Sequence, residues 1–143
     1  MVDKFLAKWK ADIDSYKNFD AAMIAMELDP KAREVFKTCA GTLEYKKDGD
    51  TWTALAGIEG LGLREYVYKL GEEIDGVGLD GVSLKTTSHL EGDALIEHST
   101  SQKTGIPITI TRRVTGDGNT LDCTLHVHVD PKVAEMTYTM TKI

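Results

Sequence analysis

The sequence predicts an all-β protein, a ten-stranded antiparallel up-and-down β-barrel that carries a short helix-turn-helix lid after its first strand. Runs of alternating apolar and polar residues fill most of the chain, which is the period of a strand with one buried face. Each run ends at a tight-turn signal, where Asp-Gly and Gly-Asn pairs supply the positive φ angles that two-residue hairpins need. The turn signals lie at residues 47–50, 79–81, 91–93, 103–105, 116–119 and 130–131.

The first strand is expected at residues 4–13. Its apolar side chains are Phe5, Leu6, Trp9 and Ile13. Trp9 is expected to pack the closed end of the barrel. The strand is followed by a change of period, which marks the start of the helical pair.

Two short helices are expected between residues 18 and 41. The first covers residues 18–28, with Asn18 suited to the N-cap position. Its apolar face consists of Phe19, Ala22, Met23 and Met26. The second helix has Asp29 as its cap and Pro30 at the first helical position, and it ends at residues 39–41. Its apolar stripe consists of Ala32, Val35 and Phe36.

Nine further strands are expected after the helices. They lie at residues 42–46, 51–58, 63–70, 73–77, 82–90, 94–100, 107–115, 120–129 and 133–142. Up-and-down closure removes the exposed sheet edges, and the helical pair can cover one open end. A barrel of ten strands is wider than side chains alone can fill, so the fold predicts an internal ligand cavity.

The last strand indicates what this cavity can hold. Met136, Tyr138 and Met140 alternate with threonines, so one face of the strand is apolar and adaptable while the other is small and polar. An inner face of this kind suits an apolar ligand.

Length and composition limit the function classes. The 143 residues are expected to form one domain, residues 1–143, which is large enough to bury a core without metal or disulfide. The net charge is −6 and the 17 Lys and Arg residues are dispersed, which argues against a nucleic-acid partner. Cys39 and Cys123 lack metal-ligand spacing, so we expect reduced thiols, no metal and no cofactor.

The sequence also predicts the compartment. The N-terminal residues have no apolar signal-peptide core, and no stretch of about 20 apolar residues could span a bilayer. We therefore expect a soluble cytoplasmic protein, present as a monomer.

Three segments of the chain resemble one known family. Residues 5–10 read Phe-Leu-Ala-Lys-Trp-Lys, residues 18–20 read Asn-Phe-Asp, and residues 68–73 read Tyr-Lys-Leu-Gly-Glu-Glu. In this order they resemble the intracellular lipid-binding proteins, which include the fatty-acid-binding and cellular retinoid-binding proteins. The resemblance runs the whole length of the chain. It implies a clam-shaped barrel with two helices at the portal, a water-containing cavity, and reversible carriage of fatty acids or retinoids through the cytosol.

The chain departs from the family pattern at the ligand headgroup. The resemblance maps the Arg of the eighth strand onto Arg112. It maps the Arg-x-Tyr of the last strand onto Tyr138-Thr139-Met140, so the second Arg is missing and Met140 replaces the Tyr. Ala7 also stands where many members have Gly, and the spacer between Trp9 and Asn18 is longer than usual. The change at the headgroup weakens the fatty-acid assignment more than the fold assignment.

Strand period predicts where Arg112 points. If Ile108 and Ile110 face inward, then Arg112 does too. A buried guanidinium stays charged and therefore needs a carboxylate, ordered water or other hydrogen-bonding partners. A ligand carboxylate would meet that need. The alternatives are a pair with an internal Glu or Asp, or a slipped register that puts Arg113 inside.

Two interpretations are open for each of the other candidate residues. Tyr138 would donate its hydroxyl to the ligand headgroup or be a packed ring with a satisfied hydroxyl. Met23, Met26, Met136 and Met140 would line an adaptable binding surface or simply fill the core. Leu61, in a turn before a strand, and Val35, on the second helix, are the expected portal residues, and ordinary helix-to-barrel packing is the alternative.

Two further groups are expected to have no functional role. His126 and His128 share a face and have a spacing that would hold a metal weakly, but the opposite phase is the apolar one, so they are expected to point to solvent. Cys123 lies on the inward phase without an inward His to activate it, so we expect a small core residue rather than a nucleophile.

The residues leave three possible functions, which can be placed in order of preference. The first is a cytoplasmic carrier that reversibly binds a long-chain fatty acid, with Arg112 as charge partner and Tyr138 as hydrogen-bond donor. The second is a carrier of a retinoid or other neutral apolar ligand, favoured by the missing Arg. The third, an enzyme, is not expected, because no nucleophile with its base and no paired inward carboxylates are evident. Transient membrane contact through the helical lid would suit either carrier.

Overall fold

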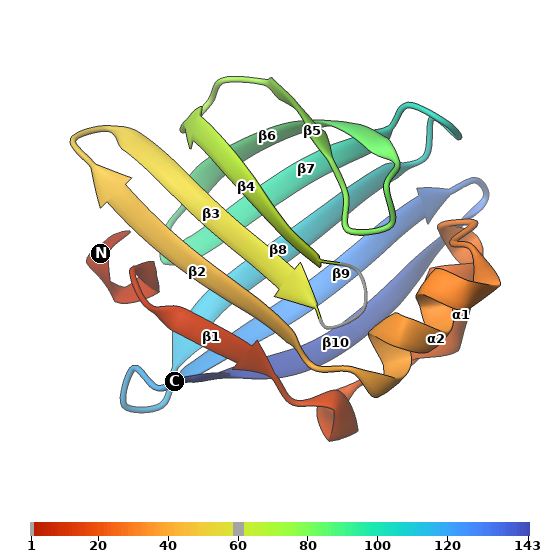
Figure 1. Ribbon diagram of the computed structural model, residues 1–143, viewed down its shortest axis with the longest axis horizontal. Helices are drawn as coiled ribbons and strands as arrows, with labels where there is room; N and C mark the ends of the chain where they lie inside the picture. Colours follow the sequence, from red (N-terminus) through yellow and green to blue (C-terminus); the bar gives the residue numbers. More distant parts are fainter. Residues whose placement is uncertain (1, 59–61) are drawn as a thin grey trace.

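The computed structural model describes residues 2–58 and 62–143. A ten-stranded antiparallel sheet is curved into a near-closed barrel, with two helices inserted after the first strand, as the sequence predicts (Figure 1). The helices are α1 (Phe19–Ala25) and α2 (Pro30–Thr38). The strands are β1 (Lys8–Ala11), β2 (Gly41–Asp48), β3 (Thr51–Ile58), β4 (Gly62–Lys69), β5 (Ile74–Val77), β6 (Ser83–Glu91), β7 (Ala94–Ser101), β8 (Pro107–Thr115), β9 (Thr120–Val129) and β10 (Lys132–Lys142).

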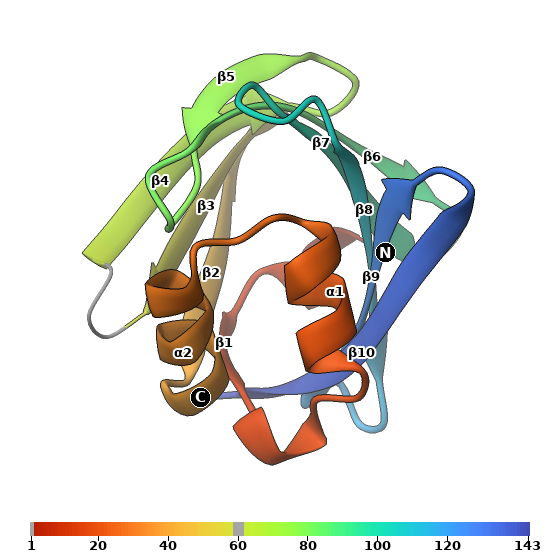
Figure 2. The ribbon, with the colours of Figure 1, turned by 90° about the vertical axis from the view of Figure 1, so that its right-hand side faces the viewer.

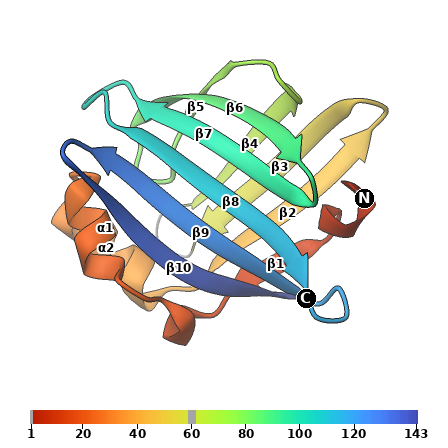
Figure 3. The same ribbon diagram turned by 180° about the vertical axis from the view of Figure 1, so that it is seen from behind.

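The strands follow one another in space almost as they do in sequence. Their order is β4-β3-β2-β1-β10-β9-β8-β7-β6-β5, so β1 and β10 pair and join the two ends of the chain (Figure 3). Figure 2 shows α1 and α2 at one open end of the barrel. The nine strands after the helices begin and end within two residues of the predicted bounds, because their turn residues end each run where the sequence indicates.

A side chain bridges the two strands at the ends of this order, β4 and β5. The hydroxyl of Tyr66 on β4 donates a hydrogen bond of 2.6 Å to the carbonyl oxygen of Val77 on β5. Gly76 leaves room for the Tyr66 ring, since a Cβ at that position would lie 3.0 Å from a ring carbon. A tyrosine therefore connects β4 and β5, which are not neighbours in the sheet order.

The prediction of a first strand over residues 4–13 was too long. Only Lys8–Ala11 forms β1, and Phe5 and Ile13 lie in short 3-10 helices, Val2–Phe5 and Ile13–Ser15. Asp12 ends the strand because its side chain accepts a hydrogen bond from the backbone N–H of Asp14 and so caps the second 3-10 helix.

The first helix is shorter than predicted, and its N-cap differs. Asn18 occupies the N-cap position in the left-handed region (φ 63°) but makes no capping bond. Its side-chain amide instead donates to the carbonyl oxygen of Glu135 on β10, at 2.7 Å, and ties the helix entry to the barrel. The second helix begins as predicted, with the Asp29 side chain accepting from Lys31 N and Pro30 in the first turn.

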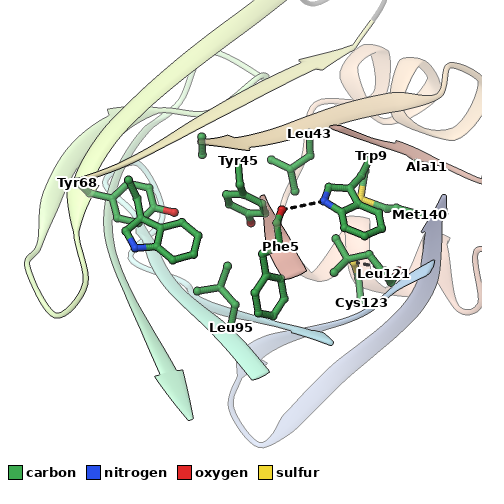
Figure 4. Packing of buried hydrophobic residues seen from close by; sticks show 12 residues of the cluster. Phe5, Trp9, Ala11, Leu43, Tyr45, Tyr68, Leu95, Leu121, Cys123 and Met140 are labelled. Carbon is green, nitrogen blue, oxygen red and sulfur yellow. Dashed lines mark hydrogen bonds between the residues drawn. The ribbon is translucent and has the colours of Figure 1, made fainter. Parts of the chain in front are cut away.

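The buried side chains form two clusters, one at each end of the barrel. Figure 4 shows the first, in which the indole nitrogen of Trp9 donates to the carbonyl oxygen of Phe5 at 3.1 Å. Phe5 belongs to the 3-10 helix at the end of the barrel opposite α1 and α2 (Figure 1), so Trp9 packs the closed end as expected. The second cluster joins Phe19, Ala22 and Met23 of α1 to the inner face of β9 and β10.

Among the described residues, no helix is both long enough and apolar enough to cross a membrane.

Candidate ligand-binding site

A cavity of about 210 Å³ lies between the helical pair and the inner face of the barrel. Its walls are mainly apolar, and they include six of the eight residues that the sequence singled out as ligand-site candidates. These are Met23, Met26, Arg112, Met136, Tyr138 and Met140. Val35 is half-buried on α2 but does not line the cavity, and Leu61 lies outside the described residues.

The register of three neighbouring strands brings the polar side chains of the cavity together. Arg112 on β8 lies directly opposite Cys123 on β9, and Cys123 lies opposite Tyr138 on β10. The side chains of these three residues therefore form one row across the inner face of the sheet. Leu95 on β7 lies opposite Arg112, which puts Glu97 one inward step further along β7 and diagonal to Arg112.

Arg112 points inward, as strand period predicts. It is only 7% exposed, whereas Arg113 is exposed and lies 3.5 Å from Asp93 on the outer surface. The prediction of an inward Arg112 is therefore confirmed, and the alternative of a slipped register with Arg113 inside is wrong.

A buried ion pair neutralises the Arg112 guanidinium. Its Nε donates to Oε1 of Glu97 at 2.7 Å, and the two side chains are 9% and 15% exposed. The sequence left open a pair with an internal carboxylate, and this is what the structure contains. The other Glu97 oxygen, Oε2, accepts a hydrogen bond of 3.1 Å from the Tyr45 hydroxyl.

The remaining nitrogens of Arg112 differ in their partners. Nη1 donates to Cys123 Sγ at 3.1 Å and to the Tyr138 hydroxyl at 3.3 Å. Nη2 makes no hydrogen bond to any residue of the described chain. Because Arg112 lines the cavity, Nη2 is available as a donor to a bound molecule.

Burial and neighbouring charges set the protonation of Arg112 and Tyr138. Burial alone would lower the pKa of Arg112, but its neighbours Tyr138, Tyr45 and Glu97 raise that pKa well above its usual value, so the guanidinium stays charged. Desolvation raises the pKa of Tyr138 although Arg112 opposes this, so Tyr138 keeps its proton. A protonated Tyr138 hydroxyl can donate to a ligand oxygen.

A second cavity, of about 520 Å³, adjoins the first. The two share four lining residues, which are Met26, Phe36, Leu79 and Leu125. Phe36 on α2 and Leu79 in the loop between β5 and β6 therefore border both cavities, whereas Val35 borders neither.

Glu97 is the site residue that sequence reasoning missed. The predicted strand 94–100 alternates Leu95, Glu97 and Ser99 on one phase, and this phase proves to be the inward one. Periodicity gave no signal for it, because the opposite phase of the strand, with Ala94 and Ile96, contains more apolar side chains.

The residues expected to have no functional role lie where they were predicted. His126 lies on the outer face and approaches Glu135 at 2.9 Å, and His128 contacts Thr109 on the same face. Cys123 is buried, and burial raises the pKa of its thiol, which suits a core residue better than a nucleophile. Cys39 and Cys123 are both free thiols.

Comparisons with known proteins agree with this geometry. No protein-family model matches the chain. The fatty acid-binding protein of Tyrophagus putrescentiae is 30% identical over 114 residues, which cover 80% of this chain and 85% of that protein. Sodium/calcium exchanger regulatory protein 1 of Doryteuthis pealeii is 30% identical over 118 residues, which cover 82% of this chain and 84% of that protein.

A solved structure extends the similarity to almost the whole chain. The Schistosoma mansoni fatty acid binding protein, in complex with arachidonic acid, superimposes with a TM-score of 0.83 and 26% identity, covering 98% of this chain and 96% of that chain. The lipid-binding barrel, its apolar cavity and these relatives together identify the chain as a member of the intracellular lipid-binding protein family, the non-enzymatic carriers that include the fatty-acid-binding proteins.

Proposed function

We propose that the protein is a cytosolic carrier of a long-chain fatty acid. The carboxylate is held by Arg112 Nη2 and the Tyr138 hydroxyl, and the acyl chain lies along Met23 and Met136 toward the adjoining cavity at Phe36. The observation that carries the proposal is a charged guanidinium in an apolar cavity, with one nitrogen that makes no hydrogen bond to the residues the structure describes. A carboxylate bound there forms charge-assisted hydrogen bonds in a desolvated setting.

The comparisons support the same ligand class. Relatives of this chain include proteins named for fatty-acid binding, and one similar structure is a complex with arachidonic acid. In keeping with this proposal we expect the protein to act as a monomer. The helical pair would make transient contact with membranes, and Ile24 on α1, which is 60% exposed, offers an apolar side chain for that contact.

A specific observation favours a second candidate, a carrier of a retinoid or other neutral lipid. Glu97 already neutralises Arg112, and Tyr138 and Met140 stand where the family pattern has an Arg and a Tyr. A headgroup site with one paired cation attracts a carboxylate less strongly than a site with two free ones. A ligand hydroxyl or carbonyl can use the same two donors without adding charge.

The test compares laurate with 1-dodecanol, which share a chain length and differ in charge. Dissociation constants are measured for the wild type, for Glu97→Gln, and for the double variant Glu97→Gln/Arg112→Met. If Arg112 holds the carboxylate, the double variant binds laurate about tenfold or more weakly than Glu97→Gln does, while dodecanol, which loses only an uncharged acceptor's hydrogen bond, loses less affinity.

The double variant avoids a confounding effect of a single Arg112 substitution, which would leave the Glu97 charge buried and unpaired. Equal loss of laurate and dodecanol binding would mean that the cavity itself was damaged. Laurate binding that is unchanged in the double variant contradicts the proposed headgroup site, and a wild type that binds only dodecanol supports the second candidate.

A further inference from the structure

Glu97 is the carboxylate that pairs with the cavity-lining Arg112 guanidinium. It bonds to Arg112 on β8 and to the Tyr45 hydroxyl on β2, and its electrostatic neighbours include Tyr66 and Tyr68 on β4 and Cys123 on β9. The tyrosines and the thiol are neutral at physiological pH because burial raises the pKa of each. The charges of Glu97 and Arg112 therefore cancel, and the pair is electrically neutral.

A carboxylate ligand disturbs this balance. Next to Arg112 it adds a second negative charge to the Arg112–Glu97 pair, which holds one positive charge, so one charge of this group is left uncompensated in a poorly solvated interior. Such a charge is costly to bury, and two carboxylates that compete for one cation lower this cost by sharing a proton. Glu97 is 15% exposed and bonded at both oxygens, so it has little access to solvent that could stabilise its charge instead.

We infer that Glu97 is the residue that determines ligand specificity in this cavity, because it couples the binding of a carboxylate lipid to the uptake of one proton. The inference rests on the proposed function. The proton lies between Glu97 and the ligand carboxylate, forming an O–H···O bond, while Arg112 and Tyr138 donate to the remaining oxygens. A neutral lipid adds no charge and binds without proton uptake. Carboxylate affinity therefore rises as pH falls, and neutral-lipid affinity does not.

The experiment uses the intact wild-type protein with laurate and 1-dodecanol as probes. Binding heats are measured by titration calorimetry in two buffers of different ionisation enthalpy, at several pH values at which free laurate is ionised. The expected result is the uptake of about one proton per laurate, with a dissociation constant that increases up to about tenfold for each pH unit. Dodecanol is expected to bind with no proton exchange at every pH.

Two variants and a control variant test whether Glu97 is the residue responsible for the proton uptake. Glu97→Gln is expected to remove both the proton uptake and the pH dependence, and to bind laurate more tightly at alkaline pH because Arg112 is freed. Tyr45→Phe removes the other hydrogen bond to Glu97 without changing charge, and it keeps the proton uptake. Glu91→Gln, on the exposed end of β6, is the matched carboxylate control and is expected to behave as wild type.

The outcomes separate this inference from the proposed function. Laurate binding with no proton exchange in the wild type overturns the inference and leaves the fatty-acid carrier intact. Proton uptake that persists in a folded Glu97→Gln variant also overturns it. Failure of laurate to bind at any pH, with dodecanol bound, overturns the proposed fatty-acid function and the coupling with it. The wild-type measurement decides the question even if Glu97→Gln does not fold.

Discussion

Arg112 and Glu97 form a buried ion pair inside a lipid-binding barrel, and this pair dominates the chemistry at the residue scale. Desolvating two charges is costly, and the cost is offset only because the pair has a short bond and the Tyr45 hydroxyl satisfies the second carboxylate oxygen. The same arrangement leaves Nη2 without a hydrogen bond to the described residues. Under the proposed function, a charged ligand shares the Arg112 guanidinium with Glu97.

The pair predicts strongly non-additive effects on stability. Arg112→Met alone leaves Glu97 buried and unpaired and is expected to lower the free energy of unfolding by about 3–5 kcal/mol. Adding Glu97→Gln removes that charge, so the double variant is expected to be more stable than Arg112→Met. Urea unfolding of the wild type, both single variants and the double variant measures the coupling. Additive effects would contradict a direct interaction between the two side chains.

Sequence reasoning predicted one half of this pair. Side chains alternate between the two faces of the strand at residues 107–115, so Arg112 lies on the same inner face as Ile108 and Ile110. The partner could not be predicted in the same way, since the proximity of Glu97 to Arg112 depends on the register between β7 and β8. Tyr45, which completes the network from β2, is more distant still in sequence.

At the scale of elements, α2 contributes a wall to both cavities. Phe36 borders the first cavity and the adjoining one, while Val35, the residue expected at the portal, lines neither. Consecutive residues of a helix point about 100° apart, so an error of one position along α2 moves a side chain from the portal to another face. Helix caps at Asp29 and Pro30 could be predicted from local chemistry, but the rotation of α2 against the barrel could not.

Phe36→Ala is expected to widen the passage between the two cavities. Removing the ring should accelerate release of a bound fluorescent fatty acid to acceptor vesicles by about tenfold, with a smaller change in the association rate. Val35→Ala, on the same helix but away from both cavities, is the matched control and should release ligand at the wild-type rate. Equal acceleration in both variants would point to general loosening of α2 rather than to a portal at Phe36.

At the scale of the whole molecule, the barrel topology follows from the regular alternation of strand runs and turns. Ten alternating runs with turn residues between them specify an up-and-down barrel, and the later strands form within two residues of their expected bounds. The first strand and first helix were less predictable because Asp12 and Asn18 make tertiary or local polar contacts that periodicity does not reveal. Cavity size and the Tyr66 bridge between β4 and β5 likewise depend on closure of the whole sheet.

The packing of the whole barrel also predicts its behaviour at alkaline pH. All five tyrosines have a pKa raised above the ordinary value of 10.0, in each case mainly because burial disfavours the anion. A raised pKa in the folded state gives stability that is fully present below the unfolded value and is lost as pH rises above it. Tyrosinate absorbance and circular dichroism are therefore expected to change together above pH 10.0. Tyrosine titration with the circular dichroism of the fold unchanged would contradict this.

The central claim, a carrier whose cavity holds a fatty acid at Arg112, is tested most directly by identifying what the protein binds in cells. Native mass spectrometry of gently purified protein would give the mass of any bound molecule, and organic extraction would identify it. The account predicts a bound fatty acid in the wild type that is lost in Glu97→Gln/Arg112→Met while the fold is retained. A neutral lipid in the cavity, or an empty barrel that does not take up added fatty acid, would contradict it.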